Sequence, residues 1–163
     1  MTERQQYDVV KRIGNAELRQ YHPCVMADVT VNADYRFAAN LGFRPLVTYI
    51  SRSNIAMTAP VVQEQRDTRS WVVSFVMPDG MHLADLPTPE NADVRLRPVP
   101  TQSAAALEFS GIATEDKLRE KEAELRTILQ REQLAATGPL RLARFDPPWK
   151  PGFMRHNEVI IPV

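Results

Sequence analysis

The sequence predicts one α+β domain, a distorted antiparallel β-barrel of two pseudo-symmetric halves with two main helices. Three observations predict it. Segments with the period of a strand outnumber helical ones, and their connections resemble hairpins rather than βαβ crossovers. The order strand, helix, strand, strand occurs twice, roughly over residues 7–90 and 91–163, although the halves share little identity. The length of 163 residues suits a single domain with one core.

The first half begins with a strand and a helix. Apolar side chains recur at every second position of residues 25–31, which is the period of a half-buried strand. Asn32 or Asp34 can cap the helix that follows. Its apolar face is formed by Phe43, Leu46, Val47 and Ile50. Pro45 lies inside this pattern, so we expect a kink there.

The remaining elements follow from the same patterns. Further strands are expected at residues 58–65, 71–77, 94–97, 104–110, 140–145 and 158–161. Residues 79–89 are rich in Pro, Gly and Asp and predict a loop. Thr114 is expected to cap the second helix, and Gly138 with Pro139 to end it.

Charge and composition exclude several function classes. The 20 basic and 20 acidic side chains cancel, so no field of the whole chain attracts nucleic acid or an anionic membrane. Cys24 is the single cysteine and has no partner for an intramolecular disulfide. The N-terminus lacks the apolar run of a secretory signal, and no segment is long enough to span a membrane. A cytoplasmic protein is expected, and the oligomeric state stays open.

Four motifs in a fixed order resemble the SOUL haem-binding protein family. They are Glu-Leu-Arg-Gln-Tyr at 17–21, Ile-Ala-Met-Thr-Ala-Pro-Val at 55–61, the segment 71–78, and Phe-Asp-Pro-Pro-Trp-Lys-Pro-Gly-Phe at 145–153 followed by Arg-His-Asn-Glu-Val at 155–159. The resemblance extends over nearly the whole chain. It implies a barrel of two pseudo-symmetric halves and a soluble, non-enzymatic protein that binds haem or another porphyrin as carrier, buffer or sensor.

The resemblance also implies a haem site beside the first helix. Its apolar wall is formed by Phe43, Leu46 and Val47. Lys150, from the proline-rich loop, is expected near the haem propionates. The two cations of the family helix fall here at Asn40 and Thr48, so Arg36 and Arg44 are expected to replace them. The spacing of the three apolar residues equally suits ordinary core packing.

His22 is the expected iron ligand. A histidine of some family members falls at Gln20, and residues two apart on a strand point to the same face. The alternative for His22 is a histidine held in a turn. His82 and His156 are too scattered for a zinc site, and Cys24 is expected to be a buried, unreactive thiol.

Two other functions stay open. One is a small-molecule effector-binding module related to bacterial drug-sensing domains, in which Glu108 would face the ligand. The other is a hydrolase of small reactive compounds with Glu158 or Glu108 as the base. A simpler role is also available, in which Asn157 and Glu158 hydrogen-bond the loop 146–152 and fix its path. A non-enzymatic protein is favoured because no other residues complete a mechanism.

Overall fold

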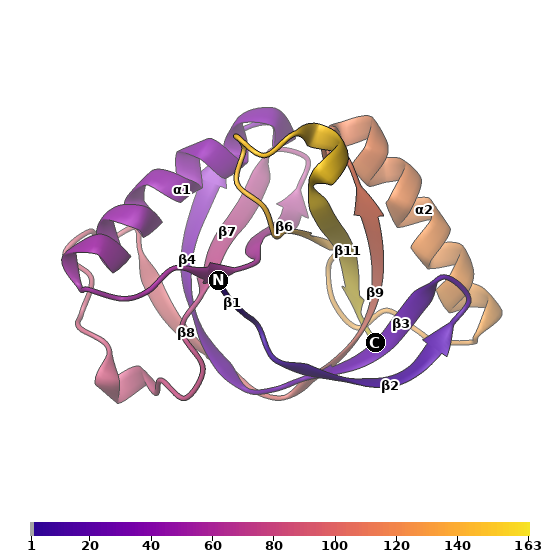
Figure 1. The fold of residues 1–163 in the computed structure, drawn as a ribbon, viewed down its shortest axis with the longest axis horizontal. Helices are drawn as coiled ribbons and strands as arrows, with labels where there is room; N and C mark the ends of the chain where they lie inside the picture. The colour runs from indigo at the N-terminus through magenta and orange to yellow at the C-terminus, as the bar shows by residue number, and fades with distance from the viewer. Residues whose placement is uncertain (1) are drawn as a thin grey trace.

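The computed structural model describes residues 2–163 and shows an α+β domain. Nine strands form one antiparallel sheet in the order β2-β3-β9-β11-β10-β6-β7-β4-β8. The sheet curls into a half-barrel, and both helices lie on its outer side (Figure 1). The predicted fold class is therefore confirmed.

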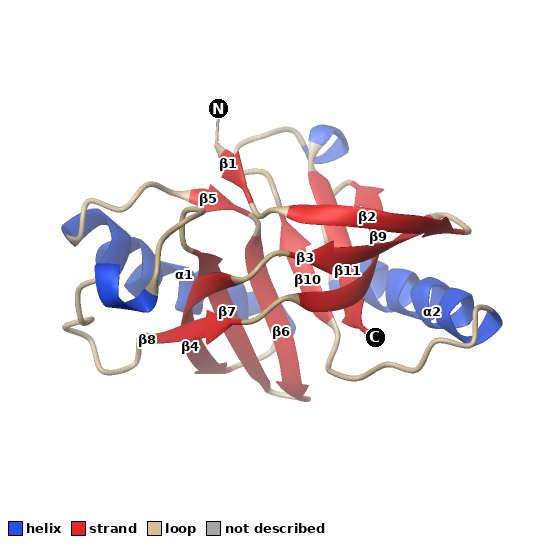
Figure 2. Cartoon of the chain, turned by 90° about the horizontal axis from the view of Figure 1, so that it is seen from below, coloured by secondary structure: helices blue, strands red, loops and turns tan. Residues whose placement is uncertain are grey.

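The elements alternate between strands and two long helices. The helices are α1 (Tyr35–Arg52) and α2 (Glu115–Arg131), and the short 3-10 helices are η1 (Leu83–Asp85) and η2 (Gly152–Met154). The strands are β1 (Glu3–Arg4), β2 (Tyr7–Ile13), β3 (Ala16–Tyr21), β4 (Cys24–Asn32), β5 (Thr58–Ala59), β6 (Val61–Asp67), β7 (Ser70–Val76), β8 (Arg95–Val99), β9 (Gln102–Ser110), β10 (Arg141–Arg144) and β11 (His156–Pro162). The short strands β1 and β5 pair in parallel at one end of the main sheet (Figure 2).

The two halves share the predicted order. Elements β4-α1-β6-β7 form the first unit and β9-α2-β10-β11 the second. The units join where β10 pairs with β6. Each unit also receives a strand from the other half, since β8 pairs with β4 and β3 pairs with β9. One continuous sheet therefore runs through both halves.

Helix α1 packs closely on the sheet. Its buried face includes Ala38, Gly42 and Leu46, and it continues through Pro45. A Cβ atom on Gly42 would lie 2.5 Å from Cβ of Val73 on β7, so only glycine fits this contact. Asp34 holds the cap position, although its side chain makes no capping hydrogen bond.

Helix α2 begins as predicted and ends earlier. The hydroxyl of Thr114 accepts a hydrogen bond from the Lys117 backbone N–H at 3.2 Å. The helix ends at Arg131, so the expectation that Gly138 and Pro139 end it is wrong. The chain turns away already at Gln133, whose φ of 56° is left-handed.

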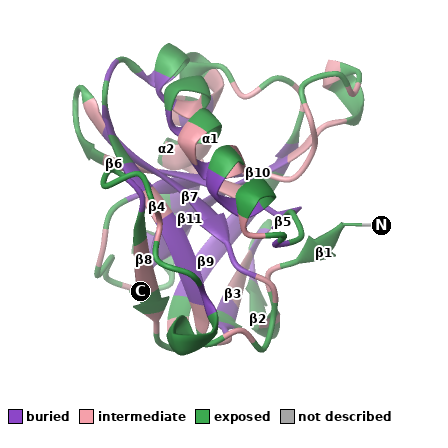
Figure 3. Cartoon of the chain, turned by 90° about the vertical axis from the view of Figure 1, so that its left-hand side faces the viewer, coloured by how far each residue is buried: buried purple, intermediate pink, exposed green. Residues whose placement is uncertain are grey.

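The main core lies between the helices and the outer face of the sheet. It is formed by the apolar residues of α1 and α2 and by alternate residues of the strands, such as Val73, Leu107 and Val159. Their neighbours point to the inner face, where a smaller apolar cluster includes Tyr21, Ala106 and Ile160. Figure 3 shows the buried residues concentrated along the strands. The inner face carries most of the polar groups described below.

Among the described residues, neither helix is long and apolar enough to cross a membrane.

Candidate functional site

A groove lies between the second half of α1 and the loop before β8. It has a volume of about 270 Å³. This α1 groove is lined by Pro45, Thr48, Tyr49, Arg52, Ser53, Pro87, Thr88, Pro89, Glu90, Asn91 and Val94. The Tyr49 hydroxyl donates to the Pro87 carbonyl at 2.7 Å, and Arg52 pairs with Glu90 at 2.9 Å. The lining residues include no histidine, cysteine or methionine.

None of the predicted helix residues lines this groove. Leu46 has 0% exposure and belongs to the core, so it supports the helix from beneath. Phe43 is partly exposed and packs edge-on against Phe75, with ring centroids 5.3 Å apart. Val47 packs against the core, and Arg36 and Arg44 point to the surface. The structure therefore does not gather these residues around one cavity.

Lys150 is held within its own loop. Its Nζ lies 2.9 Å from Oδ1 of Asp146, and Oδ2 of Asp146 accepts the His156 backbone N–H at 2.6 Å. The Arg155 guanidinium donates to the carbonyls of Lys150 and Pro148. Asp146 and Arg155 therefore fix the path of the proline-rich loop.

The expectation that Asn157 and Glu158 fix this loop is wrong. These consecutive residues of β11 point to opposite faces of the sheet, and within residues 2–163 neither side chain hydrogen-bonds the loop 146–152. The Asn157 side chain donates to the Gly111 carbonyl at 2.8 Å. Glu158 reaches across the inner face, where Arg19 binds both of its carboxylate oxygens, at 2.7 and 3.0 Å.

Glu158 is the centre of a buried network on the inner face. Its side chain is 3% exposed and also lies 3.2 Å from Nε2 of His156. Burial alone would raise the pKa of Glu158, but hydrogen bonds from His156 and Arg19 outweigh it and lower the pKa below its usual value. A carboxylate with both oxygens bound and a lowered pKa is a poor general base.

The same network includes a possible metal-binding group. Ligand atoms of Glu108, His156 and Glu158 lie within 4.8 Å of one another. The Arg19 guanidinium already neutralises Glu158, however, so a cation would have to displace it. Glu108 is 67% exposed and lies 4.0 Å from His156. It faces solvent rather than an enclosed ligand.

A larger hollow surrounds the turn between β3 and β4. It has a volume of about 730 Å³ and mostly apolar walls. This β3–β4 hollow is lined by His22, Pro23, Cys24, Val25, Asp79, Gly80, Met81, His82, Leu83, Pro98, Val99 and Pro100. His22 and His82 both line this hollow, although they are 60 positions apart in the sequence and were not expected to lie together. The two histidines share the hollow because the loop after β7 packs beside the β3–β4 turn, a contact that the sequence pattern does not predict.

His22 is held by a carboxylate. Its Nε2 lies 2.9 Å from Oδ2 of Asp8 on the neighbouring strand β2. Metal-binding histidines commonly have a carboxylate on the second ring nitrogen, which fixes the ring. In the described part of the chain, no hydrogen bond involves Nδ1 of His22.

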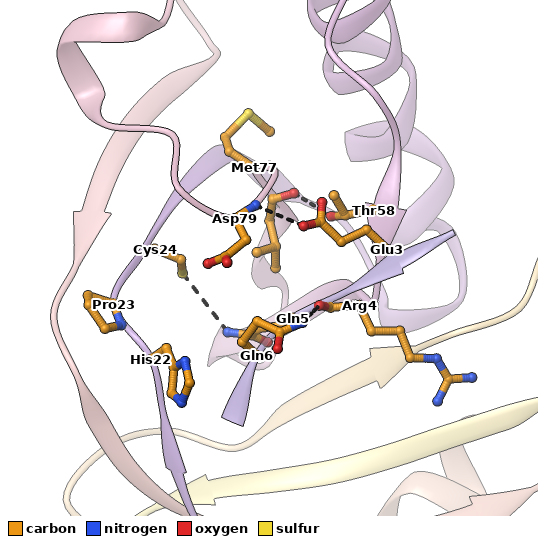
Figure 4. Close-up of a pocket in the computed structure, with 11 residues that line it drawn as sticks. Glu3, Arg4, Gln5, Gln6, His22, Pro23, Cys24, Thr58, Met77 and Asp79 are labelled. Carbon is orange, nitrogen blue, oxygen red and sulfur yellow. Dashed lines mark hydrogen bonds between the residues drawn. The ribbon is translucent and has the colours of Figure 1, made fainter. Parts of the chain in front are cut away.

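Cys24 is half-buried, so the expectation of a fully buried thiol is wrong. Burial raises the pKa of its Sγ, which lies 4.0 Å from Nε2 of Gln5. Figure 4 shows this thiol directed toward Gln5 in a small cavity. The cavity volume of about 20 Å³ is enough for about one water molecule.

Residues 2–162 match the SOUL heme-binding protein family. The chain therefore belongs to this haem-binding family, as its motifs predict. A search of curated proteins found no match.

Several solved structures share the fold. The C-terminal domain of EcmrR is 14% identical, with a TM-score of 0.74 over 96% of both chains. A hydrolase encoded by lin2189 from Listeria innocua is 14% identical, with a TM-score of 0.61 over 91% of both chains. SAV2435 bound to tetraphenylphosphonium is 13% identical, with a TM-score of 0.56 over 97% of this chain and 93% of that chain. At these identities the likeness concerns the fold alone.

Proposed function

We propose that this protein binds haem or a related porphyrin non-covalently and acts as a carrier, buffer or sensor. The observation that carries the proposal is the β3–β4 hollow, which combines apolar walls with two histidines. Membership of the SOUL family supports the same ligand.

The hollow offers an apolar wall and two histidines to a porphyrin, although its lining includes Asp79 and no lysine or arginine for the propionates. Pro98, Val99 and Pro100 form an apolar wall for a flat ring, and the volume of about 730 Å³ lies within the usual range of small-molecule sites. Haem, when bound, would supply an iron that accepts ligands from the protein. His22, oriented by Asp8, would offer its Nδ1, and His82 would offer a second nitrogen from the facing loop.

The α1 groove is the rival location for the ring. It lies on the second half of the helix that the family resemblance indicates. Lys150, Arg36 and Arg44 stay the propionate partners expected from that resemblance, although none of them lines the groove. Its volume of about 270 Å³ holds only part of a porphyrin, and its lining offers no histidine, cysteine or methionine to the iron. In that case Phe43, Leu46 and Val47 would hold α1 in place beneath the groove and would not contact the ring.

A haemin titration followed at the Soret band tests the function. We expect saturable binding to the wild type, a changed spectrum in His22→Ala, and a weaker change in His82→Ala. His156→Gln is the matched control, because this histidine lies outside the hollow. Absence of a saturable Soret change would refute haem binding.

A second pair of variants locates the ring. Thr48→Lys restores the family cation in the α1 groove, and Thr48→Glu introduces the opposite charge. If the ring binds in the β3–β4 hollow, both variants keep the wild-type affinity. Opposite changes in affinity, together with an unchanged His22→Ala spectrum, would place haem in the α1 groove instead. Thr127→Lys and Thr127→Glu on exposed α2 control for charge alone.

The alternative, a module that binds apolar cations, has weaker support. SAV2435, which shares the fold, was solved with tetraphenylphosphonium. Here the buried carboxylate of the inner face is already neutralised by Arg19, and Glu108 is largely exposed. Titration with tetraphenylphosphonium, in the wild type and in Glu108→Gln, tests this function. The hydrolase alternative requires a base, and Glu158→Gln tests it with a panel of electrophilic substrates.

A further inference from the structure

The inner face of the half-barrel contains a separate hollow. It has a volume of about 310 Å³, and neither helix covers this side of the sheet (Figure 1). This inner hollow is lined by Gln5, Tyr21, His22, Met26, Val62, Glu64, Arg66, Ser74, Arg97, Val99, Gln102, Thr137, Gly138, Pro139, Arg141 and Pro162. Its residues come mainly from eight strands of the sheet and from the loop before β10.

Arg141 lies in this hollow without a counter-ion. The residue is 8% exposed, and its Nη1 donates to Oε1 of Gln102 at 2.7 Å. Among residues 2–163, no carboxylate oxygen lies within 4.0 Å of its guanidinium. Glu64 is its partner in the register of β6 and β10, yet this carboxylate lies nearer to Arg66, at 3.6 Å. Most donors of the Arg141 fork therefore have no protein acceptor.

The other buried or half-buried arginines of the inner face differ from Arg141. Arg97 pairs with Asp28 at 2.7 Å, and Arg19 pairs with Glu158 at 2.7 Å. Burial lowers the pKa of Arg141, which reflects the cost of holding this cation away from water. A bound anion would offset that cost.

The charges around the hollow also favour an anion. Three arginines line the hollow, namely Arg66, Arg97 and Arg141. Only two carboxylates offset them, that of Glu64 in the lining and that of Asp28, which is bonded to Arg97. One positive charge is therefore left over. His22 borders the hollow as well, and its ring nitrogen is directed to Asp8.

The walls indicate the remaining part of the ligand. Tyr21, Pro139 and Pro162 border the hollow and provide apolar surface beside the arginine. The Tyr21 ring centroid lies 5.4 Å from Cζ of Arg141. A guanidinium fork matches the two oxygens of a planar carboxylate. The volume suits a small molecule rather than a chain.

We propose that the inner hollow binds a small organic carboxylate, with its carboxylate on the Arg141 guanidinium and its apolar part against Tyr21, Pro139 and Pro162. His22 and Val99 border both this hollow and the proposed haem site, but Arg141 lines the inner hollow alone and its site involves no iron.

Calorimetric titration with 2-naphthoate at fixed ionic strength tests the proposal. We expect saturable binding to the wild type and no binding of 2-naphthamide, which has the same ring without the charge. Arg141→Gln should weaken 2-naphthoate binding at least tenfold, which corresponds to about 1.4 kcal/mol. Arg131→Gln, on the exposed surface of α2 and outside the lining of the hollow, is the matched control and should change the affinity less than twofold.

Two further readouts keep the test decisive. Arg141→Lys keeps the charge without the fork and should bind several-fold more weakly than the wild type, so it replaces Arg141→Gln if that variant does not fold. Haemin binding should be unchanged in either variant, which separates this site from the haem site. Equal affinity in the Arg141 variants, equal binding of the amide, or no binding of 2-naphthoate, benzoate or hexanoate at millimolar concentration would each overturn the proposal.

Discussion

Removal of either partner of the buried Arg19–Glu158 pair should destabilise the domain, and by different amounts. Arg19→Met leaves the Glu158 carboxylate, which is 3% exposed, with His156 as its remaining partner at 3.2 Å. Glu158→Gln leaves the Arg19 guanidinium still 2.8 Å from Glu17. The carboxylate therefore loses its compensating charge, whereas the guanidinium keeps one.

The expected magnitudes follow from this asymmetry. Removing one partner of a buried pair costs about 3–5 kcal/mol, so we expect about 4 kcal/mol for Arg19→Met. Glu158→Gln weakens charge-assisted hydrogen bonds, each worth about 1.5–3 kcal/mol, so we expect about 2 kcal/mol. The double variant Arg19→Met/Glu158→Leu removes both charges and should be more stable than Arg19→Met alone.

Urea unfolding and thermal unfolding, each followed by circular dichroism, measure these differences. At about 2–4 °C per kcal/mol for a domain of this size, Arg19→Met should lower the Tm by roughly 8–16 °C. A cost for Glu158→Gln equal to or larger than that for Arg19→Met would refute the asymmetry. A double variant less stable than Arg19→Met would refute the role of the uncompensated charge.

Three other predictions concern acid pH, the helix contact and the loop. Because the pKa of Glu158 is lower in the folded state, its ionised form contributes fully to stability above the unfolded pKa, near 4.5. This contribution is lost as the pH falls from there through the folded pKa. Arg19→Met should therefore flatten the dependence of the urea midpoint on acid pH. Gly42→Ala drives a Cβ into β7 and should cost about 1–3 kcal/mol in urea unfolding, while Ser51→Ala on the exposed side of α1 should be nearly neutral. Lys150→Met removes a partly exposed ion pair and should cost at most about 1 kcal/mol in thermal unfolding, so a larger loss would contradict a merely local role.

Local patterns predicted most of the fold. The strand at 25–31 became β4, the one at 104–110 became β9, and Thr114 caps α2. These features depend on residues close together in sequence, because alternation and capping involve only a few neighbouring positions.

The N-terminal hairpin was missed for the opposite reason. Strand β2 is an edge strand, exposed along most of its length, so no apolar alternation distinguishes it from a loop. It exists because β3 pairs with β9, about 80 residues further along the chain, and β2 then pairs with β3.

The candidate sites depended even more on distant contacts. The sequence singled out His22, Lys150 and Glu158 as residues that carry chemistry. It did not reveal that Arg19, 139 positions from Glu158, neutralises that carboxylate. Nor did it reveal that His82 shares a hollow with His22.

Periodicity and short motifs are local properties, so the sequence was enough for the strand-helix-strand-strand order of each half, the start of α2 and the SOUL family. Only the tertiary structure decided which charges are paired. Strand alternation assigns a side chain to a face, but the pairing of β10 with β6 and β11 decides its neighbours. The cost of a buried charge depends on those neighbours and on access to water. For this reason Glu158 is neutralised by Arg19, while Arg141 bonds Gln102 and has no carboxylate partner among the described residues.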